Sequence, residues 1–354
     1  MSFSVRQKRK IRIAATIIIA GNALGIFYVL WSDGFGSLFP YINTVTIATL
    51  IGLVISVFEL QVVDEKMRNI RFVPLLIIRT AVYVVLIPLI ILLELMTARV
   101  IKFGLSYKEV YYSDEFQNYL FNEDFSILLV YVVALAFLIN FIYQISRKMG
   151  QGIMLNFITG KYKNPVKEER IIMFMHVSNS QEIINKIGSI RFLEFLNRIL
   201  FDITESILLY RGIIYEYVED ECVVSWKLEQ GVKEANCLLS VLDIIQKMEV
   251  QKKSYLAEFE VFPELEIAFH YGLVLQAEVG TIKSKVAFYG DVMNITARML
   301  GKCKELGKQV LMSAELEKLL QIPAHCNAES LGIISLRGKS EPIELFTLST
   351  TDFQ

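Results

Sequence analysis

The feature that most constrains this chain is a series of four long apolar runs in its first 145 residues. Each is long enough to cross the roughly 30 Å hydrocarbon core of a bilayer as a helix. The whole chain of 354 residues is 54% hydrophobic with a mean hydropathy of +0.45, which is too apolar for a purely soluble protein. The sequence therefore predicts a bundle of four transmembrane helices over residues 1–148. The runs are Ile13–Trp31, Val45–Val63, Val73–Leu95 and Ile127–Ile145.

Basic residues beside these runs predict the orientation of the bundle. Lys and Arg gather before the first run and again over residues 66–71, whereas the loop 32–44 has neither. Because basic loops stay on the cytoplasmic side, we expect a multi-pass protein of the inner (cytoplasmic) membrane with both termini in the cytoplasm. Inside the runs, Glu59 and Arg79 lie toward the same membrane face. They are predicted to form an ion pair, with snorkelling to the headgroups or a ligand site as alternatives.

The second half of the chain alternates strands and helices. A connector over residues 149–169 is rich in Gly and contains Pro165, which predicts a jointed segment rather than one helix. The order that follows, βαββαβ with an added tail, predicts a ferredoxin-like α+β sandwich over residues 170–354. The expected elements are a strand at 170–177, a helix at 181–210, a hairpin at 212–228, a helix at 232–253, strands at 265–279 and 284–289, and a helix from Asp291.

The most informative stretch of this half is Tyr289–Arg298, with the sequence YGDVMNITAR. It predicts a strand end, a tight glycine turn and a helix that begins with an acidic residue. Asn294 and Arg298 are four residues apart, so they lie on one face of that helix. An amide beside a guanidinium suits a ribose and a phosphoryl group. A solvated Asn and Arg on the surface is the alternative.

This stretch resembles the G-D-x-V-N-x-x-x-R signature of the class III nucleotide cyclases. Other segments resemble blocks of the same family in the family's order: the hairpin 212–226, the strand Ala268–Val274, the turn Val279–Gly280 and the closing ribbon Leu336–Phe346. The chain is similar to membrane-anchored adenylate or guanylate cyclases with an N-terminal helical bundle, which are common in the Bacteroidetes. The resemblance implies a class III cyclase fold for the second half of the chain.

The resemblance also implies an activity and a set of residues. Class III cyclases convert ATP or GTP into 3′,5′-cyclic nucleotide and pyrophosphate in intracellular signalling. By this resemblance the catalytic residues are Asn294, which positions the ribose, and Arg298, which stabilises charge on the phosphorus. Glu216 and Ala287 occupy the positions of the pair that reads the purine, where adenylate cyclases carry Lys and either Asp or Thr. The sequence therefore does not name the base.

The metal site departs from the family. In class III cyclases two carboxylates hold two Mg²⁺ or Mn²⁺ ions against the triphosphate. Asp220 matches the second carboxylate, but His176, 44 residues earlier, stands where the first Asp belongs. A neutral imidazole brings no negative charge and suits softer metals better than Mg²⁺. Glu219 replaces a glycine at the hairpin tip, where it either adds a metal carboxylate or blocks the turn.

Active sites of this family form between two subunits, one supplying the metal carboxylates and the other the Asn and Arg. Three interpretations follow: a homodimeric cyclase, a partner subunit that lends Asn294 and Arg298 to an intact cyclase chain in a heterodimer, and a pseudocyclase receptor that only binds nucleotide or a partner. The net charge of −1 gives no reason to expect nucleic acid. The expected partners are ATP or GTP, the lipid bilayer and a second cyclase chain.

Overall fold

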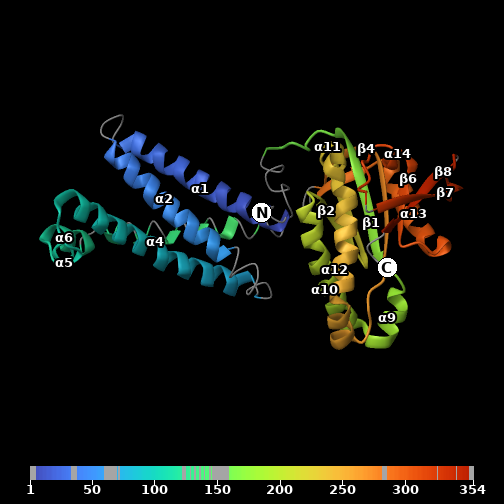
Figure 1. Ribbon diagram of the computed structural model, residues 1–354, viewed down its shortest axis with the longest axis horizontal. Helices are drawn as coiled ribbons and strands as arrows, with labels where there is room; N and C mark the ends of the chain where they lie inside the picture. Colours follow the sequence, from blue (N-terminus) through green and yellow to red (C-terminus); the bar gives the residue numbers. More distant parts are fainter. Residues whose placement is uncertain are drawn as a thin grey trace. The chain divides into compact units, whose positions relative to one another are not determined.

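The structure, a computed structural model, describes residues 5–32, 38–59, 70, 72–121, 159–280, 285–324, 326–339 and 341–350, with short pieces between 125 and 145. The chain divides into two compact units, Met1–Lys148 and Met149–Gln354, and each is described by itself (Figure 1).

The regular elements in the described part of the first unit are all helices. Its elements are α1 (Val5–Ser32), α2 (Phe39–Val57), α4 (Phe72–Phe103), α5 (Tyr107–Tyr111) and α6 (Asp114–Phe121). Glycines let α1 and α2 pack closely. A Cβ added to Gly25 would lie 2.6 Å from Thr44, and one added to Gly52 would lie 2.9 Å from Ile18. Small residues at such contacts are typical of helix pairs in membranes.

The described helices match the predicted spans unevenly. By length and composition α4 can cross a membrane. The apolar stretches Ala14–Phe27 of α1 and Tyr41–Val57 of α2 are shorter. The helix α2 begins at Phe39, before the predicted run, because Pro40 favours a helix start in its first turn. It ends at Val57. Residues 60–63 and eight of the nineteen residues in 127–145 lie outside the described part of the chain. The bundle of four transmembrane helices therefore stays a prediction.

One ion pair predicted from the sequence is confirmed. Arg79 Nη2 lies 3.0 Å from Glu59 Oε2, and the Arg79 side chain is fully buried. The Tyr83 hydroxyl also donates to Glu59. Burial of the guanidinium between α2 and α4 argues against snorkelling, because a snorkelling side chain reaches toward water.

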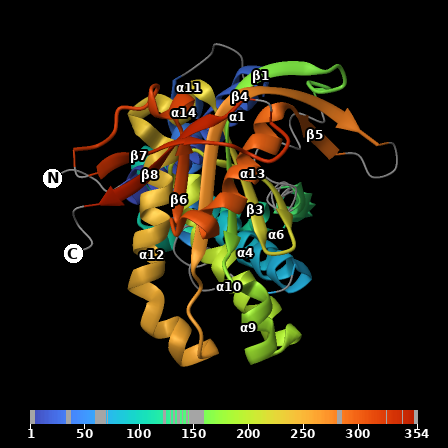
Figure 2. The same cartoon turned by 90° about the vertical axis from the view of Figure 1, so that its right-hand side faces the viewer.

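The second unit is a mixed sheet with helices on both faces. The strand order is β2-β3-β1-β4-β6-β8-β7, and β5 pairs with the outer half of β4 as a two-stranded extension (Figure 2). The strands are β1 (Val166–Val177), β2 (Ile213–Val218), β3 (Glu221–Lys227), β4 (Leu265–Val279), β5 (Lys285–Tyr289), β6 (Val310–Ser313), β7 (Cys326–Ile334) and β8 (Ile343–Thr350). The helices are α9 (Ser180–Ile187), α10 (Ser189–Leu209), α11 (Leu228–Val232), the 3-10 turn η2 (Lys233–Ala235), α12 (Asn236–Phe259), α13 (Asp291–Leu306) and α14 (Ala314–Glu317).

Alternation along β1 divides the unit into two cores. Ile171, Met173 and Met175 pack with α10 and α12 on one face, whereas Ile172 and Phe174 pack with α13 on the other (Figure 1). This follows from the period of two in a strand whose faces are both covered. The four strands β2-β3-β1-β4 with α10 and α12 form the ferredoxin-like arrangement that the order βαββαβ predicts.

Several predicted boundaries were wrong. The helix predicted at 181–210 is two helices, because Gly188 has a positive φ of 82° between them. The helix predicted at 232–253 begins at Asn236, after two residues with positive φ, Glu234 and Ala235, and runs on to Phe259. The first strand begins at Val166 rather than 170, since its first residues already pair with β4.

Candidate active site

The turn before α13 requires a glycine. Gly290 has φ 154°, and a Cβ built on it would lie 2.5 Å from the Leu273 carbonyl oxygen. A second glycine fixes the helix that follows. A Cβ on Gly272 would lie 3.0 Å from the Cβ of Val292, so the absent side chain lets α13 pack directly on β4. The strand–glycine–helix form predicted for Tyr289–Arg298 is therefore confirmed.

Asn294 and Arg298 lie one turn apart on α13. Asn294 is exposed and Arg298 is half-buried, while Val292, Thr296 and Met299 face the core. The guanidinium of Arg298 packs against the loop between β7 and β8, where a Cβ on Gly338 would lie 3.3 Å from Nη2. Among the residues that the structure describes, Arg298 makes no ion pair and no side-chain hydrogen bond. Its permanent charge is thus available to an anion.

The hairpin tip between β2 and β3 carries Glu219 and Asp220. Glu219 has φ 53°, a left-handed conformation that costs a residue with a side chain about 1 kcal/mol. The turn forms even so, and β2 and β3 pair up to Val218 and Glu221. Glu219 therefore does not block the turn. Its side chain is exposed, whereas Asp220 is half-buried.

His176 lies in a row of side chains that crosses three strands. Its neighbours in register are Glu221 on β3 and Glu266 on β4. His176 Nε2 is 3.0 Å from Glu266 Oε2, and Ser178 Oγ donates to Glu266 Oε1 at 3.2 Å. Burial raises the pKa of the Glu221 carboxyl, and the nearby His176 opposes part of that rise. Sequence reasoning missed Glu266, although the alignment of β1 with β4 brings it to this position.

The structure brings His176 and Asp220 together, since both line one small cavity with Cys222. A carboxylate and an imidazole are nevertheless a poor donor set for two Mg²⁺ ions, which prefer oxygen ligands. The nitrogen Nε2 of His176 is moreover engaged by Glu266. No group of three or more His, Cys, Asp or Glu side chains able to hold a metal occurs in the described part of the chain. These residues do not fit the two-metal site that the resemblance implies.

The two positions expected to read the purine differ in access. Ala287 is 7% exposed and buried under its neighbours. Glu216 is accessible, and its Oε1 lies 2.9 Å from Lys285 Nζ at the start of β5. This hydrogen bond raises the pKa of Lys285. Tyr215 and Phe288, which adjoin the two positions, stack with ring centroids 4.1 Å apart.

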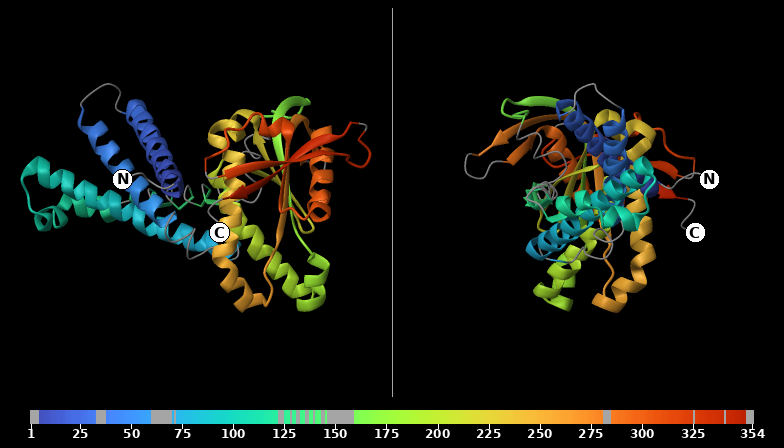
Figure 3. Two further views of the ribbon diagram at one scale, coloured as in Figure 1. Left: turned by 45° about the vertical axis from the view of Figure 1, so that its right-hand side comes forward. Right: turned by 90° about the vertical axis from the view of Figure 1, so that its left-hand side faces the viewer.

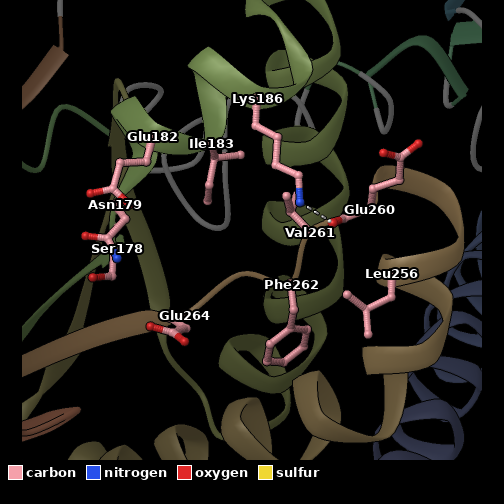
Figure 4. Close-up of a pocket in the computed structure, with 10 residues that line it drawn as sticks. All are labelled: Ser178, Asn179, Glu182, Ile183, Lys186, Leu256, Glu260, Val261, Phe262 and Glu264. Carbon is pink, nitrogen blue, oxygen red and sulfur yellow. Dashed lines mark hydrogen bonds between the residues drawn. The ribbon is translucent and has the colours of Figure 1, made fainter.

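Two other features of this unit lie apart from the site. The helix α9 and the turn from α12 to β4 lie at the same end of the second unit (Figure 3). A cavity of about 420 Å³ opens between them (Figure 4), but Asp220, Asn294 and Arg298 are not among its lining residues. Lys186 crosses it to donate to the Glu260 carbonyl at 3.0 Å. His270 is a core residue: its Nδ1 lies 2.7 Å from Ser313 Oγ, and burial lowers its pKa to about 4.

Comparison with known proteins decides the family. Residues 163–350, more than half of the chain, match the family model described as the adenylate and guanylate cyclase catalytic domain. The chain belongs to this family. The cyclase resemblance of the second unit is therefore confirmed.

Relatives of the cyclase domain include bacterial and eukaryotic proteins. Adenylate cyclase 2 of Rhizobium meliloti (strain 1021) is 32% identical over 222 residues, which are 63% of this chain and 61% of the relative. The photoactivated adenylate cyclase subunit beta of Euglena longa is 22% identical over 135 residues, which are 38% of this chain and 16% of the relative. The chain thus spans less than two thirds of the length of these relatives.

The fold is shared with solved structures of other proteins. A bacterial light-regulated adenylyl cyclase superposes with a TM-score of 0.53 and 20% identity, covering 64% of this chain and 67% of that chain. At this identity the likeness bears on the fold of the cyclase domain alone.

Proposed function

We propose that this chain is a membrane-bound nucleotide cyclase that converts ATP or GTP into 3′,5′-cyclic nucleotide and pyrophosphate in intracellular signalling. The observation that carries the proposal is the placement of Asn294 and Arg298 on α13. The tight turn at Gly290 presents Asn294 and Arg298 on one face, and the guanidinium is half-buried with no carboxylate against it in the described residues. Membership of the cyclase family supports the same activity.

The reaction is an intramolecular displacement. The ribose 3′-hydroxyl gives its proton to solvent water, and its oxygen bonds to the α-phosphorus. The bond from that phosphorus to the bridging α,β-oxygen breaks, and pyrophosphate leaves with the electron pair. Arg298 compensates the negative charge that builds on the α-phosphoryl oxygens, and a preorganised charge of this kind is typically a large catalytic contribution. Asn294 hydrogen-bonds the ribose and keeps its 3′-oxygen in line.

We further propose that two copies of the chain complete the site. Asn294 of one copy would face His176 and Asp220 of the other, with Glu219 at the rim. Large exposed apolar side chains on β4 and β5 support such an interface, since Leu273 is 53% and Tyr289 54% exposed. Leu275, which is paired with Tyr289 across the ladder, is also exposed, and an apolar patch of this kind is more typical of an interface than of a free surface.

For the whole chain we propose residues 1–148 as a membrane domain with four spans, 149–169 as a connector and 170–354 as the catalytic domain. Both termini and the catalytic domain would lie in the cytoplasm, where nucleotide is available. The apolar helix α4 and the basic residues at 66–71 support this arrangement.

The test uses the full-length protein in lipid nanodiscs, incubated with ATP or GTP and either Mg²⁺ or Mn²⁺, with cyclic nucleotide quantified by mass spectrometry. We expect 3′,5′-cyclic product from the chain alone. Product that forms only after an intact cyclase chain is added would instead establish the partner subunit. Nucleotide binding without product under every condition would establish the pseudocyclase receptor.

A further inference from the structure

One carboxylate joins the end of the connector to the sheet of the second unit. Glu168, near the start of β1, is 17% exposed, and its Oε1 lies 3.0 Å from Lys161 Nζ. Its Oε2 accepts from Arg170 Nη2 at 2.8 Å and from Gln276 Nε2 of β4 at 2.9 Å. Burial opposes ionisation of this group, but the hydrogen bonds of Lys161 and Gln276 and the charge of Arg170 lower the pKa of the carboxyl to about 2. Three segments of the chain therefore meet at one ionised group.

Two partners of Glu168 are themselves held in place. Gln276 is 1% and Arg170 3% exposed. The Arg170 guanidinium also donates to Ser225 of β3 at 3.1 Å and lies on the Phe288 ring of β5, 5.1 Å from its centroid. A buried ionic cluster is weak evidence for stability, because desolvation offsets the attraction, and its best-attested use is to fix one arrangement. The cluster therefore fixes where the connector meets the sheet.

The connector backbone is attached at the same place. The Glu278 amide donates to the Tyr162 carbonyl at 2.8 Å, and Tyr162 is buried. The first residues of β1 then pair with β4 (Figure 2). On its other edge β4 pairs through residues 275–279 with β5, residues 285–289. We call these two paired segments the arm, and the end of the connector is bound along one edge of it.

We propose that Glu168, with Lys161, Arg170 and Gln276, is a clamp through which the connector sets the position of the arm and so regulates the contact between two copies of the chain. This inference rests on the proposed function, in which the exposed apolar side chains of the arm meet the second copy. The connector links the proposed membrane domain to the catalytic domain. A shift of the connector moves the arm, because both are bound to the same carboxylate.

The experiment measures amide hydrogen exchange by mass spectrometry on full-length protein in lipid nanodiscs. Glu168→Gln removes the charge at the centre of the clamp. We expect amides of the arm to exchange about ten-fold faster or more, because hydrogen bonds to a charged group are lost, while exchange in β6 stays unchanged. Lys161→Met removes the connector's exposed cation and should quicken exchange in the arm about three-fold. Lys161→Arg keeps the cation and should match the wild type.

The matched control removes a similar ion pair elsewhere in the unit. Lys247 Nζ lies 2.8 Å from Glu205 Oε2, and the two side chains are 20% and 35% exposed. Lys247→Met should leave exchange in the arm unchanged. Equal effects of Lys247→Met and Lys161→Met, unchanged exchange in Glu168→Gln, or exchange in β6 that rises as much as in the arm would each overturn the clamp. If Glu168→Gln does not fold, the comparison of Lys161→Met with Lys161→Arg decides.

A second measurement tests transmission through the clamp. A short alanine insertion after Gly152 alters the connector ahead of the clamp. We expect the insertion to change exchange in the arm of otherwise wild-type protein and to have little effect in the Glu168→Gln background. An insertion effect of equal size in both backgrounds, or in neither, overturns the regulatory role.

These readouts do not use the cyclase reaction, so the two proposals fail separately. Cyclic product from a protein whose arm does not respond to the clamp variants would leave the cyclase standing and overturn the clamp. An arm that responds as expected in a protein without product supports the clamp and overturns the cyclase.

Discussion

His176 Nε2 lies 3.0 Å from Glu266 Oε2, across the ladder between β1 and β4. The imidazole at the position where the family resemblance predicts a metal carboxylate is thus held by a residue of its own chain. His176 lies beside Asp220 at one small cavity, as the family resemblance predicts for the first metal ligand. An imidazole, however, does not supply the carboxylate oxygens that the resemblance implies.

Replacing His176 with Asp should restore two carboxylates beside the cavity. We expect His176→Asp to bind Mg²⁺–nucleotide more tightly and to raise cyclase turnover, most clearly in Mg²⁺, because hard cations prefer oxygen ligands. The new carboxylate would repel Glu266, so the double variant His176→Asp with Glu266→Gln should gain more. Nucleotide affinity is measured by calorimetry and turnover by product formation. Unchanged affinity and turnover in both variants would contradict the account of a damaged metal site.

Removal of the free guanidinium should affect chemistry rather than folding. Arg298→Ala is expected to lower turnover by roughly two orders of magnitude or more, the usual effect of losing one preorganised charge stabiliser. The free energy of unfolding should change by less than about 0.5 kcal/mol, because the side chain makes no ion pair among the described residues. Lys302→Ala, on the same helix and paired with Glu305, is the control. An active enzyme indifferent to Arg298→Ala would refute the mechanism.

Two glycines near the site should respond to alanine in opposite directions. Gly290→Ala places a Cβ 2.5 Å from a carbonyl oxygen at φ 154°, so we expect a loss of at least about 2 kcal/mol in unfolding free energy. Gly301 lies inside α13 with nothing within 4 Å of an added Cβ. Gly301→Ala should stabilise by about 0.5–1 kcal/mol. Denaturant unfolding measures both, and equal effects would contradict the role assigned to Gly290.

The buried histidine should make the second unit sensitive to acid. Burial lowers the pKa of His270 from 6.5 to about 4, so the folded state holds the ring neutral while the unfolded chain takes up a proton. The contribution of His270 to stability is complete above pH 6.5 and is lost as pH falls toward 4. His270→Asn keeps a polar group facing Ser313 and should flatten that part of the stability curve. Stability curves of equal slope in the two proteins would disprove this.

Membrane topology can be tested with single added cysteines. Leu38→Cys lies in the loop without basic residues, so we expect it to react with an impermeant thiol reagent on whole cells. Ile70→Cys lies in the basic loop and should react only after the cells are permeabilised. The cysteines of the natural chain all lie in the second unit, which is predicted to be cytoplasmic. The reverse labelling pattern would overturn the orientation.

The sequence was sufficient for features set by local pattern. Alternation, helical periodicity and the glycine before Asp291 predict the order of elements around α13, and the fold class of the second unit follows. The pair of Glu59 and Arg79 was also predictable, because charges inside apolar runs have few other partners. The division of the helix at Gly188 was not predicted, because a single glycine inside a helical pattern is usually tolerated.

The contacts that define the site depend on strand register, which one sequence does not reveal. Glu266 meets His176 only because β4 aligns with β1 residue by residue over the whole length of β1. Lys285 reaches Glu216 only because β5 folds back along the outer half of β4. Neither partner lies within a sequence motif. Both emerged from pairings between segments some 70 to 90 residues apart.

The strand β1 contributes side chains alternately to both cores of the second unit. Neither core can therefore loosen without withdrawing packing from the strand that the other needs. We therefore expect the two layers to unfold in one transition, and amide protons along β1 should exchange only when the whole unit opens. A substitution that loosens the packing of α10 and α12 on β1 should therefore also weaken the packing of α13, although the sheet separates the side chains of the two layers.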